Sequence, residues 1–554
     1  MPLLSLASIA LLCKTLSAFD VTVITVTTSF VSHLYFRNLE PRSNLSLLVL
    51  LIFIPALLSI PISYHVGYTL ASVPLAFASY GGFLVFFTVS YRLSPLHPLA
   101  KYPGPAIAKI SKWWGAYVGG RGDLHLYYKS LHDRYGDVVR VGPNELSVCD
   151  ASLIPAVLGQ GGLPKGPRWD GLPGRPSLID QRDPILHMHQ RKPWNRAFSS
   201  KALKEYEVIL AKRARQLLDC LEDRVNGSDQ QAGLVLDMSA WFGYFAKDFM
   251  GDMAFGGGFE LMMAGGSNDG AVIGSGARIS GIFAHVTYII PPLVAIVGKS
   301  GIRDFGKERV SHRLQNGANR RDLFYYLSGE ELPESERLSA DDLALEGLLA
   351  IVAGSDTVKG TLSCALYYLI CNPAVYNRLQ EETDAAFPSG EEPLDVVKLS
   401  YMEWLNACIN ETLRLQPPVP SGSSRILGKG KGAKVFGKVD IPEETQLSLH
   451  TYSIHRDPRN FYTPDAFLPE RWLSNGAPAG EHNTSAFFPF GYGPTTCVGK
   501  NLASMEIRML LCWMLRRFRF SKAPRVTYEG WEERIRDWNV MHHDPLLVRI
   551  SLRE

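Results

Sequence analysis

The stretch Phe490-Gly-Tyr-Gly-Pro-Thr-Thr-Cys497-Val-Gly499 places a single cysteine among three glycines and a proline. Residues 500–518 follow it directly and are predicted to form an amphipathic helix. Cys497 is therefore expected in a tight loop that leads into a helix N-terminus. Backbone N–H groups without helical partners and the helix dipole favour a thiolate over a thiol at such a place. Glycines also let a backbone approach a flat, bulky group without Cβ clashes.

A thiolate presented in this way can serve as the axial ligand of a haem iron. The stretch resembles the haem-binding loop of cytochromes P450, Phe-x-x-Gly-x-Arg-x-Cys-x-Gly, which it matches at Phe490, Gly493, Cys497 and Gly499. On this resemblance Cys497 ligates the iron, and the other matched residues shape the haem-binding loop. Thr495 stands where the family usually carries an arginine that contacts a haem propionate. Taken alone, the loop also fits a buried, inert cysteine in a glycine-rich turn.

Residues 339–372 carry the second strong pattern. Ser339, with an aspartate three residues later, fits a helix cap, and Pro373 follows the end of the run, where a helix is disfavoured. One long helix is therefore predicted. Most of it is apolar, so the carboxylate and the hydroxyl in its middle, Asp356 and Thr357, require an explanation.

The segment Ala353-Gly-Ser-Asp-Thr357 matches the P450 motif Ala/Gly-Gly-x-Asp/Glu-Thr in full. The resemblance implies that Thr357 hydrogen-bonds dioxygen at the haem and that Asp356 helps to relay protons, so this pair is the catalytic candidate. Small Ala353 and Gly354 would leave room beside the flat cofactor. A polar stripe that faces a neighbouring helix is the alternative interpretation.

Glu411 and Arg414 form the Glu-x-x-Arg pattern of the family, and Arg471, in a Phe-Leu-Pro-Glu-Arg-Trp segment, is the arginine that joins this pair in P450s. The short pattern is uninformative alone, because it recurs elsewhere in the chain, and its position before Cys497 gives it weight. One carboxylate between two guanidiniums would form a buried ion triad, which specifies geometry more than it adds stability. We assign this triad to the core behind the haem, not to catalysis.

His187 and Arg191 are four residues apart and share one face of a predicted helix. In P450s this place holds a helix whose arginine contacts a haem propionate, and a planar guanidinium suits a carboxylate. Arg425 falls where many P450s keep another such arginine. Because Thr495 supplies no charge, Arg191 and Arg425 become the main candidates for holding the propionates, with His187 beside them. For His187 and Arg191, a basic, solvated helix face is the alternative.

The N-terminal region is predicted to contain membrane spans. Residues 45–63 and 67–91 are almost wholly apolar, and no Lys, Arg, Asp or Glu lies between Arg42 and Arg92. Each stretch is about long enough to cross a hydrocarbon core of roughly 30 Å, and the flanking positive charges predict a hairpin with both ends in the cytosol. Residues 15–36 are a weaker third span. Three spans, with a lumenal N-terminus, are preferred over two, and a cleaved signal peptide is a further alternative.

Lys101-Tyr-Pro-Gly-Pro105 is a stiff connector, similar to the proline-rich hinge of microsomal P450s. It divides the chain into a membrane anchor with its hinge, residues 1–100, and a catalytic domain, residues 101–554. The resemblance implies a mainly α fold with a smaller β-rich part. It also implies an endoplasmic reticulum location with the catalytic domain facing the cytosol, so that the glycosylation acceptor Asn226 would stay unmodified.

Charge and cysteine usage exclude other classes of protein. The net charge of +3 and the pI near 8.3 are too mild to indicate nucleic-acid binding. The eight cysteines contain no CxxC pair and no regular framework for disulfides or zinc. Such usage fits a reduced, cytosol-facing compartment.

The motifs occur in family order across residues 100–520, and the chain is identified as a member of the cytochrome P450 family. The resemblance implies a monooxygenase with haem b between the helix bearing Thr357 and the loop bearing Cys497. It would insert one oxygen atom from O2 into a lipophilic small molecule, by hydroxylation or epoxidation. NADPH electrons would arrive through a separate cytochrome P450 reductase, with cytochrome b5 as a further donor, since no flavin or nicotinamide module is visible. Lys500 and Arg508 would belong to the docking face for that reductase.

Two other classes stay open at this stage. A P450-type isomerase, dehydratase or peroxide-using enzyme would keep the haem without the reductase, but such members often lose the acid–alcohol pair that Asp356 and Thr357 supply. A membrane-tethered haem sensor or carrier would need no such pair at all. The local sequence around Arg191 and the predicted multi-span anchor resemble those of fungal P450s. Such P450s act in secondary metabolism, with terpenoid-like substrates, or in xenobiotic oxidation.

Overall fold

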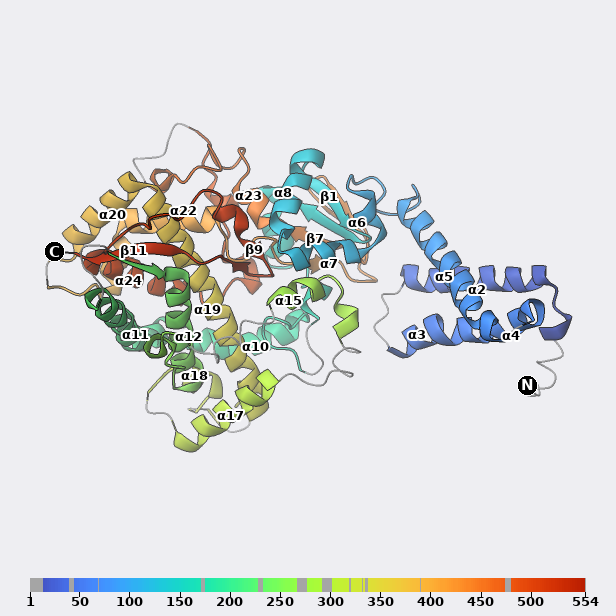
Figure 1. Cartoon of the computed structure of the whole chain (residues 1–554), viewed down its shortest axis with the longest axis horizontal. Helices are drawn as coiled ribbons and strands as arrows, with labels where there is room; N and C mark the ends of the chain where they lie inside the picture. Colours follow the sequence, from blue (N-terminus) through green and yellow to red (C-terminus); the bar gives the residue numbers. More distant parts are fainter. Residues whose placement is uncertain are drawn as a thin grey trace.

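The computed structural model of the chain describes residues 13–38, 44–67, 69–170, 175–227, 233–266, 277–290, 301–317, 320–330, 332–333, 337–388, 390–473 and 480–553. A slender bundle of helices at the N-terminal end projects from a large domain, as Figure 1 shows. The domain is mostly helical with small β-sheets, which confirms the predicted fold class.

Helices form most of the large domain, and their bounds are as follows: α6 (Ala106–Ile110), α7 (Lys112–Arg121), α8 (Leu124–Tyr135), α9 (Ile154–Leu158), α10 (Pro184–Ala197), α11 (Ser200–Asn226), α12 (Met238–Phe255), α13 (Leu261–Ala264), α15 (Ala277–Phe283), α17 (Gly301–Asn316), α18 (Leu323–Ser328), α19 (Ala340–Cys371), α20 (Pro373–Ala386), α21 (Val396–Tyr401), α22 (Glu403–Leu415), α23 (Thr451–His455) and α24 (Lys500–Arg517).

The long helix α19 runs through the middle of the domain (Figure 1). It begins as predicted, because the Ser339 hydroxyl accepts a hydrogen bond from the Asp342 N–H at 3.2 Å and caps the first turn. Helices α12 and α24 both pack against it, and side chains such as Leu362 are fully buried in the shared core. The helix thus lies at the centre of the core, with other helices packed against it.

A four-stranded sheet lies at the end of the domain nearest the bundle. Its strands follow the order β1 (Val138–Gly142), β2 (Glu145–Val148), β7 (Gln446–Leu449) and β4 (Arg425–Ile426). The pair β2–β7 is parallel and the other two pairs are antiparallel. The remaining strands form smaller sheets: β3 (Leu234–Asp237), β5 (Lys434–Phe436), β6 (Val439–Ile441), β8 (Phe518–Lys522), β9 (Arg536–Asp537), β10 (Met541–His542) and β11 (Leu547–Leu552).

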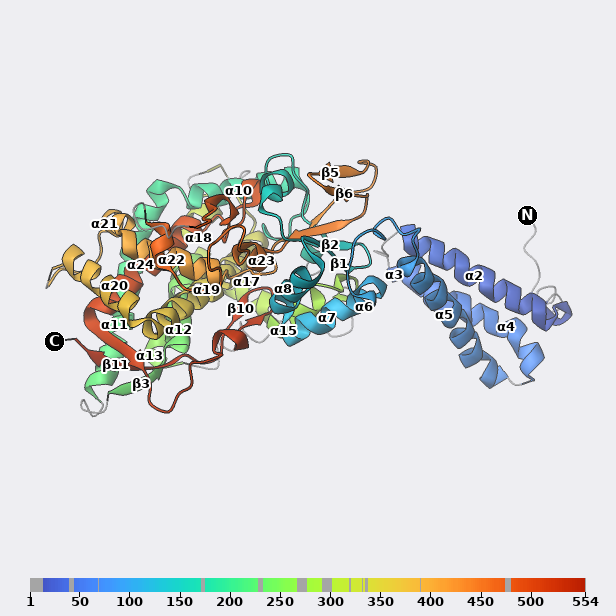
Figure 2. The ribbon, with the colours of Figure 1, turned by 90° about the horizontal axis from the view of Figure 1, so that it is seen from above.

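The N-terminal bundle consists of three helical rods that lie side by side (Figure 2). The first is α2 (Ala18–Asn38) and the last is α5 (Thr69–Leu93). Between them runs a rod made of α3 (Asn44–Leu48), a π-helical turn η1 (Val49–Phe53) and α4 (Ile54–Val66). Two of the rods, at residues 45–66 and 70–93, are long and apolar enough to cross a membrane, and they coincide with the two stronger predicted spans.

Helix α2 is more polar than its neighbours, and several of its polar side chains point into the bundle. Ser29 and Ser32 are buried there, whereas Phe30 and Val31 are exposed on the outside. The Tyr80 hydroxyl from α5 lies 2.7 Å from Ser32 Oγ and donates to a carbonyl of the π-helical turn at 2.8 Å. These bonds satisfy buried polar groups within the bundle, although Asp20, Thr22 and Thr27 of the same helix are exposed.

Candidate active site

The cysteine loop, Phe490–Gly499, turns back on itself just before α24 begins. The Cys497 N–H donates to the Phe490 carbonyl at 2.8 Å, and a short 3-10 turn lies between them. Gly491 and Gly493 both have positive φ, of 75° and 69°, a conformation that glycine adopts without the steric cost of a Cβ. The loop therefore holds the cysteine in a fixed place at the N-terminal end of α24.

The glycines of this loop have different neighbours. A Cβ added to Gly493 would overlap the carbonyl oxygen of Leu158 at the end of α9. A Cβ added to Gly499 would meet nothing closer than Phe198, at 3.7 Å. Gly493 thus also permits close packing of the loop backbone on α9, a role that the sequence did not predict.

The Cys497 side chain is exposed, yet burial raises the pKa of its thiol. A sulfur can be both exposed and surrounded by protein when it lines a space inside the domain. The backbone N–H groups of Gly499 and Lys500 and the charge of Arg191 lower this pKa, as expected for a helix N-terminus, but burial outweighs them. The predicted effects of the helix N-terminus are present, and burial opposes them. A metal cation is the kind of partner that deprotonates such a thiol outright.

The middle of α19 borders an open space, although the helix is otherwise part of the core. Val352 keeps 41 % of its surface exposed, and Ala353 beside it is also exposed. Thr357 is half-buried one turn later, and its hydroxyl donates to the Ala353 carbonyl at 2.7 Å. This bond within the helix occupies the hydroxyl hydrogen and leaves the oxygen able to accept another bond.

Gly354 does not face this space. A Cβ added to it would lie 2.7 Å from the sulfur of Met250 on α12, so this glycine allows the close packing of α12 on α19. The prediction that Ala353 and Gly354 together make room for a cofactor is therefore wrong for Gly354. Only Ala353 lies on the open side of the helix.

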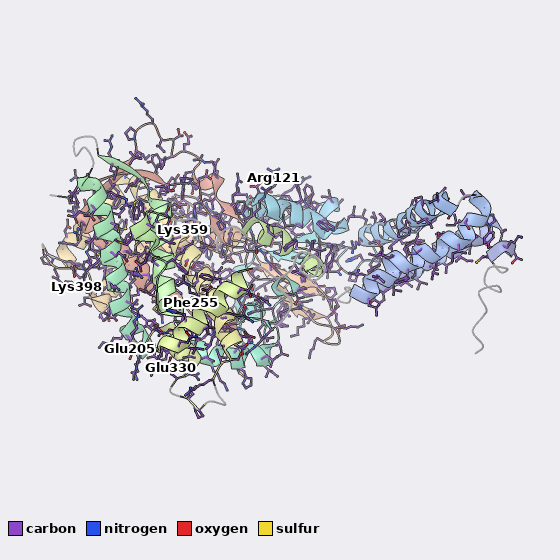
Figure 3. All side chains as sticks on the ribbon, turned by 60° about the horizontal axis from the view of Figure 1, so that its bottom comes forward. Arg121, Glu205, Phe255, Glu330, Lys359 and Lys398 are labelled. Atoms are coloured by element: carbon purple, nitrogen blue, oxygen red, sulfur yellow. The ribbon has the colours of Figure 1, made fainter. Side chains whose placement is uncertain are left out.

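Asp356 is half-buried and has cationic neighbours that the sequence did not suggest. Burial lowers the pKa of Lys247 on α12 and of His542 on β10, while the charge of Asp356 raises both. Lys359, labelled in Figure 3, lowers both and extends across Gly243 of α12. Proton-exchanging groups from α12 and β10 thus surround the predicted acid.

The predicted propionate-binding residues lie in one cluster of positive charge. His187 and Arg191 lie on α10, and Arg425 opens β4. Burial, together with the charges of Lys165, Arg191 and Arg425, lowers the pKa of His187 to about 4. Arg191 is also close enough to Cys497 for their charges to affect each other. Lys165 is a member of this cluster that sequence reasoning missed.

Arg425 also explains the unusual Thr495. Its Nη2 donates to the Thr495 hydroxyl at 2.7 Å, while its Nε has no hydrogen-bond partner among the residues that the structure describes. Arg425 is 5 % exposed, and burial lowers its pKa to about 10. Thr495 therefore orients a guanidinium at the place where the family usually supplies one.

The structure brings Glu411, Arg414 and Arg471 together, all of them buried. Arg414 makes a bidentate pair with the Glu411 carboxylate, at 2.8 Å for both bonds, and Arg471 Nε reaches the same carboxylate at 3.1 Å. The Trp472 indole and the Leu468 N–H donate to it as well, at 2.9 Å each. These two further donors were not predicted, although Trp472 adjoins Arg471 in the sequence.

His455 links this triad to the residues just before the cysteine loop. The Phe488 N–H donates to His455 Nε2 at 3.1 Å, so Nδ1 carries the hydrogen that is donated to the Arg414 carbonyl at 3.2 Å. Burial lowers the pKa of His455 to about 3, which keeps the ring neutral and the tautomer fixed. The core behind the loop is therefore tied to the loop by a hydrogen-bonded chain.

The two residues of the predicted docking face differ in exposure. Lys500 is exposed, with its ammonium 5.8 Å from the centre of the Phe490 ring. Arg508 is half-buried, and its Nε donates to the Asn406 side chain at 2.6 Å.

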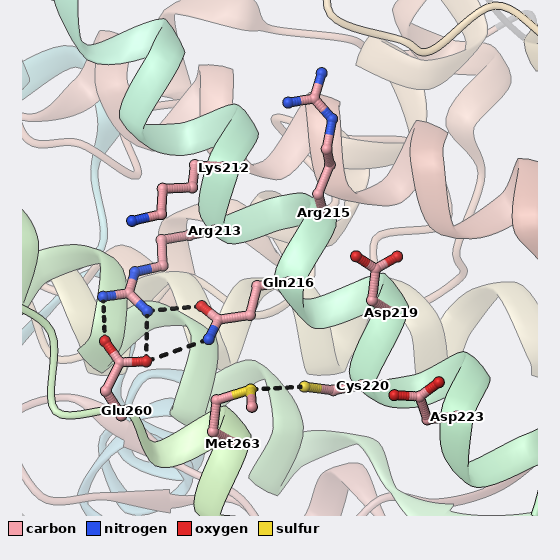
Figure 4. Close-up of a pocket in the computed structure, with 9 residues that line it drawn as sticks. All are labelled: Lys212, Arg213, Arg215, Gln216, Asp219, Cys220, Asp223, Glu260 and Met263. Carbon is pink, nitrogen blue, oxygen red and sulfur yellow. Dashed lines mark hydrogen bonds and ion pairs between the residues drawn. The ribbon is translucent and has the colours of Figure 1, made fainter.

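A groove on the outer face of α11 holds none of the predicted site residues (Figure 4). Arg213 in its wall is already paired with Glu260 and with Asp252. The groove is therefore separate from the site formed by the cysteine loop and α19.

Comparison with known proteins identifies this architecture. Residues 105–536 match the family model described as Cytochrome P450. The chain belongs to the cytochrome P450 family. It is accordingly an oxidoreductase of the P450 monooxygenase type, and the family implies haem iron as cofactor.

Similar relatives are P450 proteins of fungi. The chain is 33 % identical over 457 residues to Cytochrome P450 67 of Uromyces fabae, covering 78 % of this chain and 82 % of the relative. It is 32 % identical over 456 residues to Cytochrome P450 monooxygenase FCK2 of Fusarium pseudograminearum (81 % and 80 %). It is 33 % identical over 492 residues to Cytochrome P450 monooxygenase phqL of Penicillium fellutanum (85 % and 84 %).

The residues present fit a P450 haem. Cys497 and the Val352–Ala353 face of α19 are both left uncovered by protein, as the two sides of a flat cofactor require. Arg425 carries a buried Nε that lacks a partner within the described ranges, and it lies with Arg191 in a cationic cluster suited to carboxylates. Cys497 would hold the iron, and the cluster would hold the propionates.

Proposed function

We propose that this P450 is a membrane-bound, haem-thiolate monooxygenase that hydroxylates or epoxidises a lipophilic small molecule. Its electrons come from NADPH through a separate reductase, with cytochrome b5 as a further donor. The observation that carries the proposal is the pairing of an exposed Cys497 with the exposed face of α19 beside Thr357. The fungal relatives support a role in secondary metabolism, with terpenoid-like substrates, or in xenobiotic oxidation.

The proposed chemistry divides among residues on the two sides of the haem. Bound haem supplies the redox chemistry that activates dioxygen, and a thiolate ligand such as Cys497 favours it. Thr357 turns its hydroxyl from the Ala353 carbonyl toward the open space and holds a proton there. Asp356 takes protons from the Lys247 and His542 side and passes them to Thr357.

We also propose that residues 1–100 anchor and orient the enzyme and that residues 101–554 form its catalytic domain. The anchor lies in the endoplasmic reticulum membrane, and the domain faces the cytosol. The apolar rods at residues 45–66 and 70–93 support the membrane assignment. The packing of α2 against α5, with Ser29 and Ser32 buried between them, supports a third span.

Turnover in yeast microsomes that contain a co-expressed reductase tests this function. We expect a lipophilic substrate to stimulate NADPH consumption, and isotopically labelled O2 to leave one labelled oxygen atom in the product. Conversion without NADPH, or a product without the label, would favour the isomerase, dehydratase or peroxide-using class. Haem binding with no substrate-dependent NADPH consumption across a broad lipophilic panel would favour a sensor or carrier.

A further inference from the structure

A glycine turn at residues 256–258 follows α12 and borders open space. Gly256 has a φ of 75°, in the left-handed region that favours glycine, whereas Gly257 does not have a positive φ. A Cβ built on Gly257 would meet no atom within 4 Å. Among the described residues, the N–H groups of Gly257 and Gly258 have no acceptor. Successive unpaired N–H groups in a turn can form a nest that binds anions.

Two buried arginines pack against this turn because it has no side chains. A Cβ built on Gly256 would overlap Nη1 of Arg313, and one built on Gly258 would overlap Nη2 of Arg213. Arg213 lies on α11 and Arg313 on α17, and their residues are 3 % and 7 % exposed. The glycines therefore let guanidiniums from two helices reach the backbone of the turn.

The turn and the two arginines line one cavity of about 370 Å³. The other charged residues of its wall are Lys212, Asp252, Glu260 and Arg320. Four cations and two carboxylates thus line the cavity, so its wall is net positive. The site is separate from the space beside Cys497.

The carboxylates near the cavity have partners of their own. Arg213 donates to Asp252 through Nε and Nη2, at 2.8 and 3.0 Å, and to Glu260 through Nη1 and Nη2, at 3.1 and 2.8 Å. Figure 4 shows the pair with Glu260. Asp248 on α12 accepts three backbone N–H groups just after the turn, at 3.0 Å each. These bonds hold the turn and Arg213 in place.

Arg313 and Arg320 keep donors to spare. Arg313 Nη2 donates to Asp322 at 2.8 Å, but the buried Nε of Arg313 has no partner among the residues that the structure describes. Arg320 Nη2 lies 3.2 Å from an Asp252 oxygen that Arg213 already occupies. A buried guanidinium N–H without an acceptor costs free energy. An anion in the cavity would supply the acceptor.

We propose that this cavity binds a phosphate group, which accepts hydrogen bonds from Arg313 Nε, from Arg320 and from the N–H groups of Gly257 and Gly258. Guanidiniums and turn N–H groups are the donors that phosphate oxygens favour. In Figures 1 and 2, α11 and α12 lie on the side of the domain away from the N-terminal bundle. The ligand is therefore soluble, either inorganic phosphate or a phosphate monoester, and not a membrane lipid.

A bound phosphate would connect α12 with α17, and both of these helices pack against α19. Occupancy of the cavity would thus stabilise the helices that support Thr357. The site goes beyond the proposed oxidation chemistry and does not depend on it, because none of its residues contacts the haem.

Isothermal titration calorimetry on the purified full chain tests the site with two probes, inorganic phosphate and glycerol 3-phosphate. Gly257→Asp places a carboxylate in the open space, and Gly257→Asn places a neutral side chain of the same shape there. Arg313→Met removes the unpaired Nε. Arg303→Met, on the same helix but outside the cavity wall, is the matched control.

We expect saturable binding of one phosphate group per chain, with an affinity at least about tenfold lower in Arg313→Met, as for one lost charge-assisted hydrogen bond. Gly257→Asp should abolish binding through like-charge repulsion, whereas Gly257→Asn and Arg303→Met should stay within a few-fold of the unsubstituted chain. Tighter binding of the monoester would identify an organic phosphate as the ligand, and tighter binding of phosphate the free ion. Either order supports the site.

The absence of saturable binding of both probes overturns the proposal. Equal affinities in Gly257→Asp and Gly257→Asn overturn it as well, because the added charge would then not face the ligand. If Arg313→Met does not fold, this second comparison decides alone, since a side chain at Gly257 meets no other atom of the described protein.

Discussion

Gly491 and Gly493 are close neighbours in the cysteine loop, with φ values of 75° and 69°. No heavy atom lies nearer than 3.9 Å to a Cβ built on Gly491, whereas one built on Gly493 overlaps the Leu158 carbonyl. The same substitution at the two positions therefore separates backbone strain from a steric clash.

We expect Gly491→Ala to lower the free energy of unfolding by roughly 1–2 kcal/mol, the cost of left-handed backbone for a residue with a Cβ. Gly493→Ala should cost clearly more and reduce the haem content, because the loop must also move away from Leu158. Thermal unfolding and haem content per polypeptide measure both effects. Equal losses in the two variants would show that the contact with α9 does not position Cys497.

Thr357 and Thr361 lie one turn apart on α19, and each hydroxyl donates to the carbonyl four residues earlier, at 2.7 Å and 2.9 Å. Thr357 is half-buried beside the open space, whereas Thr361 is buried in the core. Only the first is placed to handle a proton during oxidation.

We expect Thr357→Val to lower product formed per NADPH about tenfold and to raise hydrogen peroxide release, because proton delivery contributes at least that much to such steps. Thr361→Val removes the same type of intrahelical bond and should leave coupling unchanged. Product, NADPH and peroxide are measured together in reconstituted membranes. Unchanged coupling in Thr357→Val would remove it from the proton path.

At the scale of elements, the Glu411 carboxylate on α22 binds Arg471, in a segment that precedes the cysteine loop. Burial alone would raise the pKa of Glu411, but the bonds and charges of Arg414 and Arg471 lower it overall. A group with a lowered folded pKa stabilises the fold above its unfolded pKa of about 4.3, and this contribution is lost as pH falls through the folded value. The triad is therefore expected to make the folded protein less stable at acidic pH.

We expect Glu411→Gln to lower the free energy of unfolding at neutral pH by about 3–5 kcal/mol, since it leaves two buried guanidiniums uncompensated. Glu403→Gln changes an exposed carboxylate on the same helix and should cost about 1 kcal/mol or less. Urea unfolding at pH 7 and at pH 4 measures both. A Glu411 variant as stable as the control would contradict the structural role of the triad.

The sequence predicted those elements whose determinants are local. The Ser339 cap and Pro373 bracket α19, and the Glu411–Arg414 spacing places both side chains on one face of a helix. Other features depend on contacts between distant segments, which no local pattern encodes. Lys165 meets Arg425 only through a strand contact, and Gly354 meets Met250 only because α12 crosses α19.

At the scale of the molecule, the described residues of the N-terminal region form three packed rods and not a simple hairpin (Figure 2). The polar side chains of α2 weaken its signal as a membrane span in the sequence. In the structure several of them are buried in the bundle, and the Ser29 hydroxyl, for example, donates to the Tyr80 carbonyl of α5 at 3.1 Å. Hydropathy alone cannot distinguish a polar face turned inward from one turned outward.

We expect a glycosylation acceptor appended to the N-terminus to be modified in microsomes, because three spans place that end in the lumen. Removing residues 13–38 should abolish the modification, and Asn226 in the catalytic domain should stay unmodified. The mass shift after glycosidase treatment reports all three results. A bare N-terminal acceptor in the full chain would indicate two spans, and a glycan on Asn226 would reverse the orientation.

The central claim is that Cys497 is the iron ligand of a haem enclosed between the cysteine loop and α19. The most direct measurement is the absorption spectrum of the reduced carbon monoxide complex, for the full chain and for Cys497→Ala. We predict a red-shifted Soret band of thiolate ligation in the full chain and its complete loss in the variant. A Cys497→Ala protein that keeps this band would contradict the account.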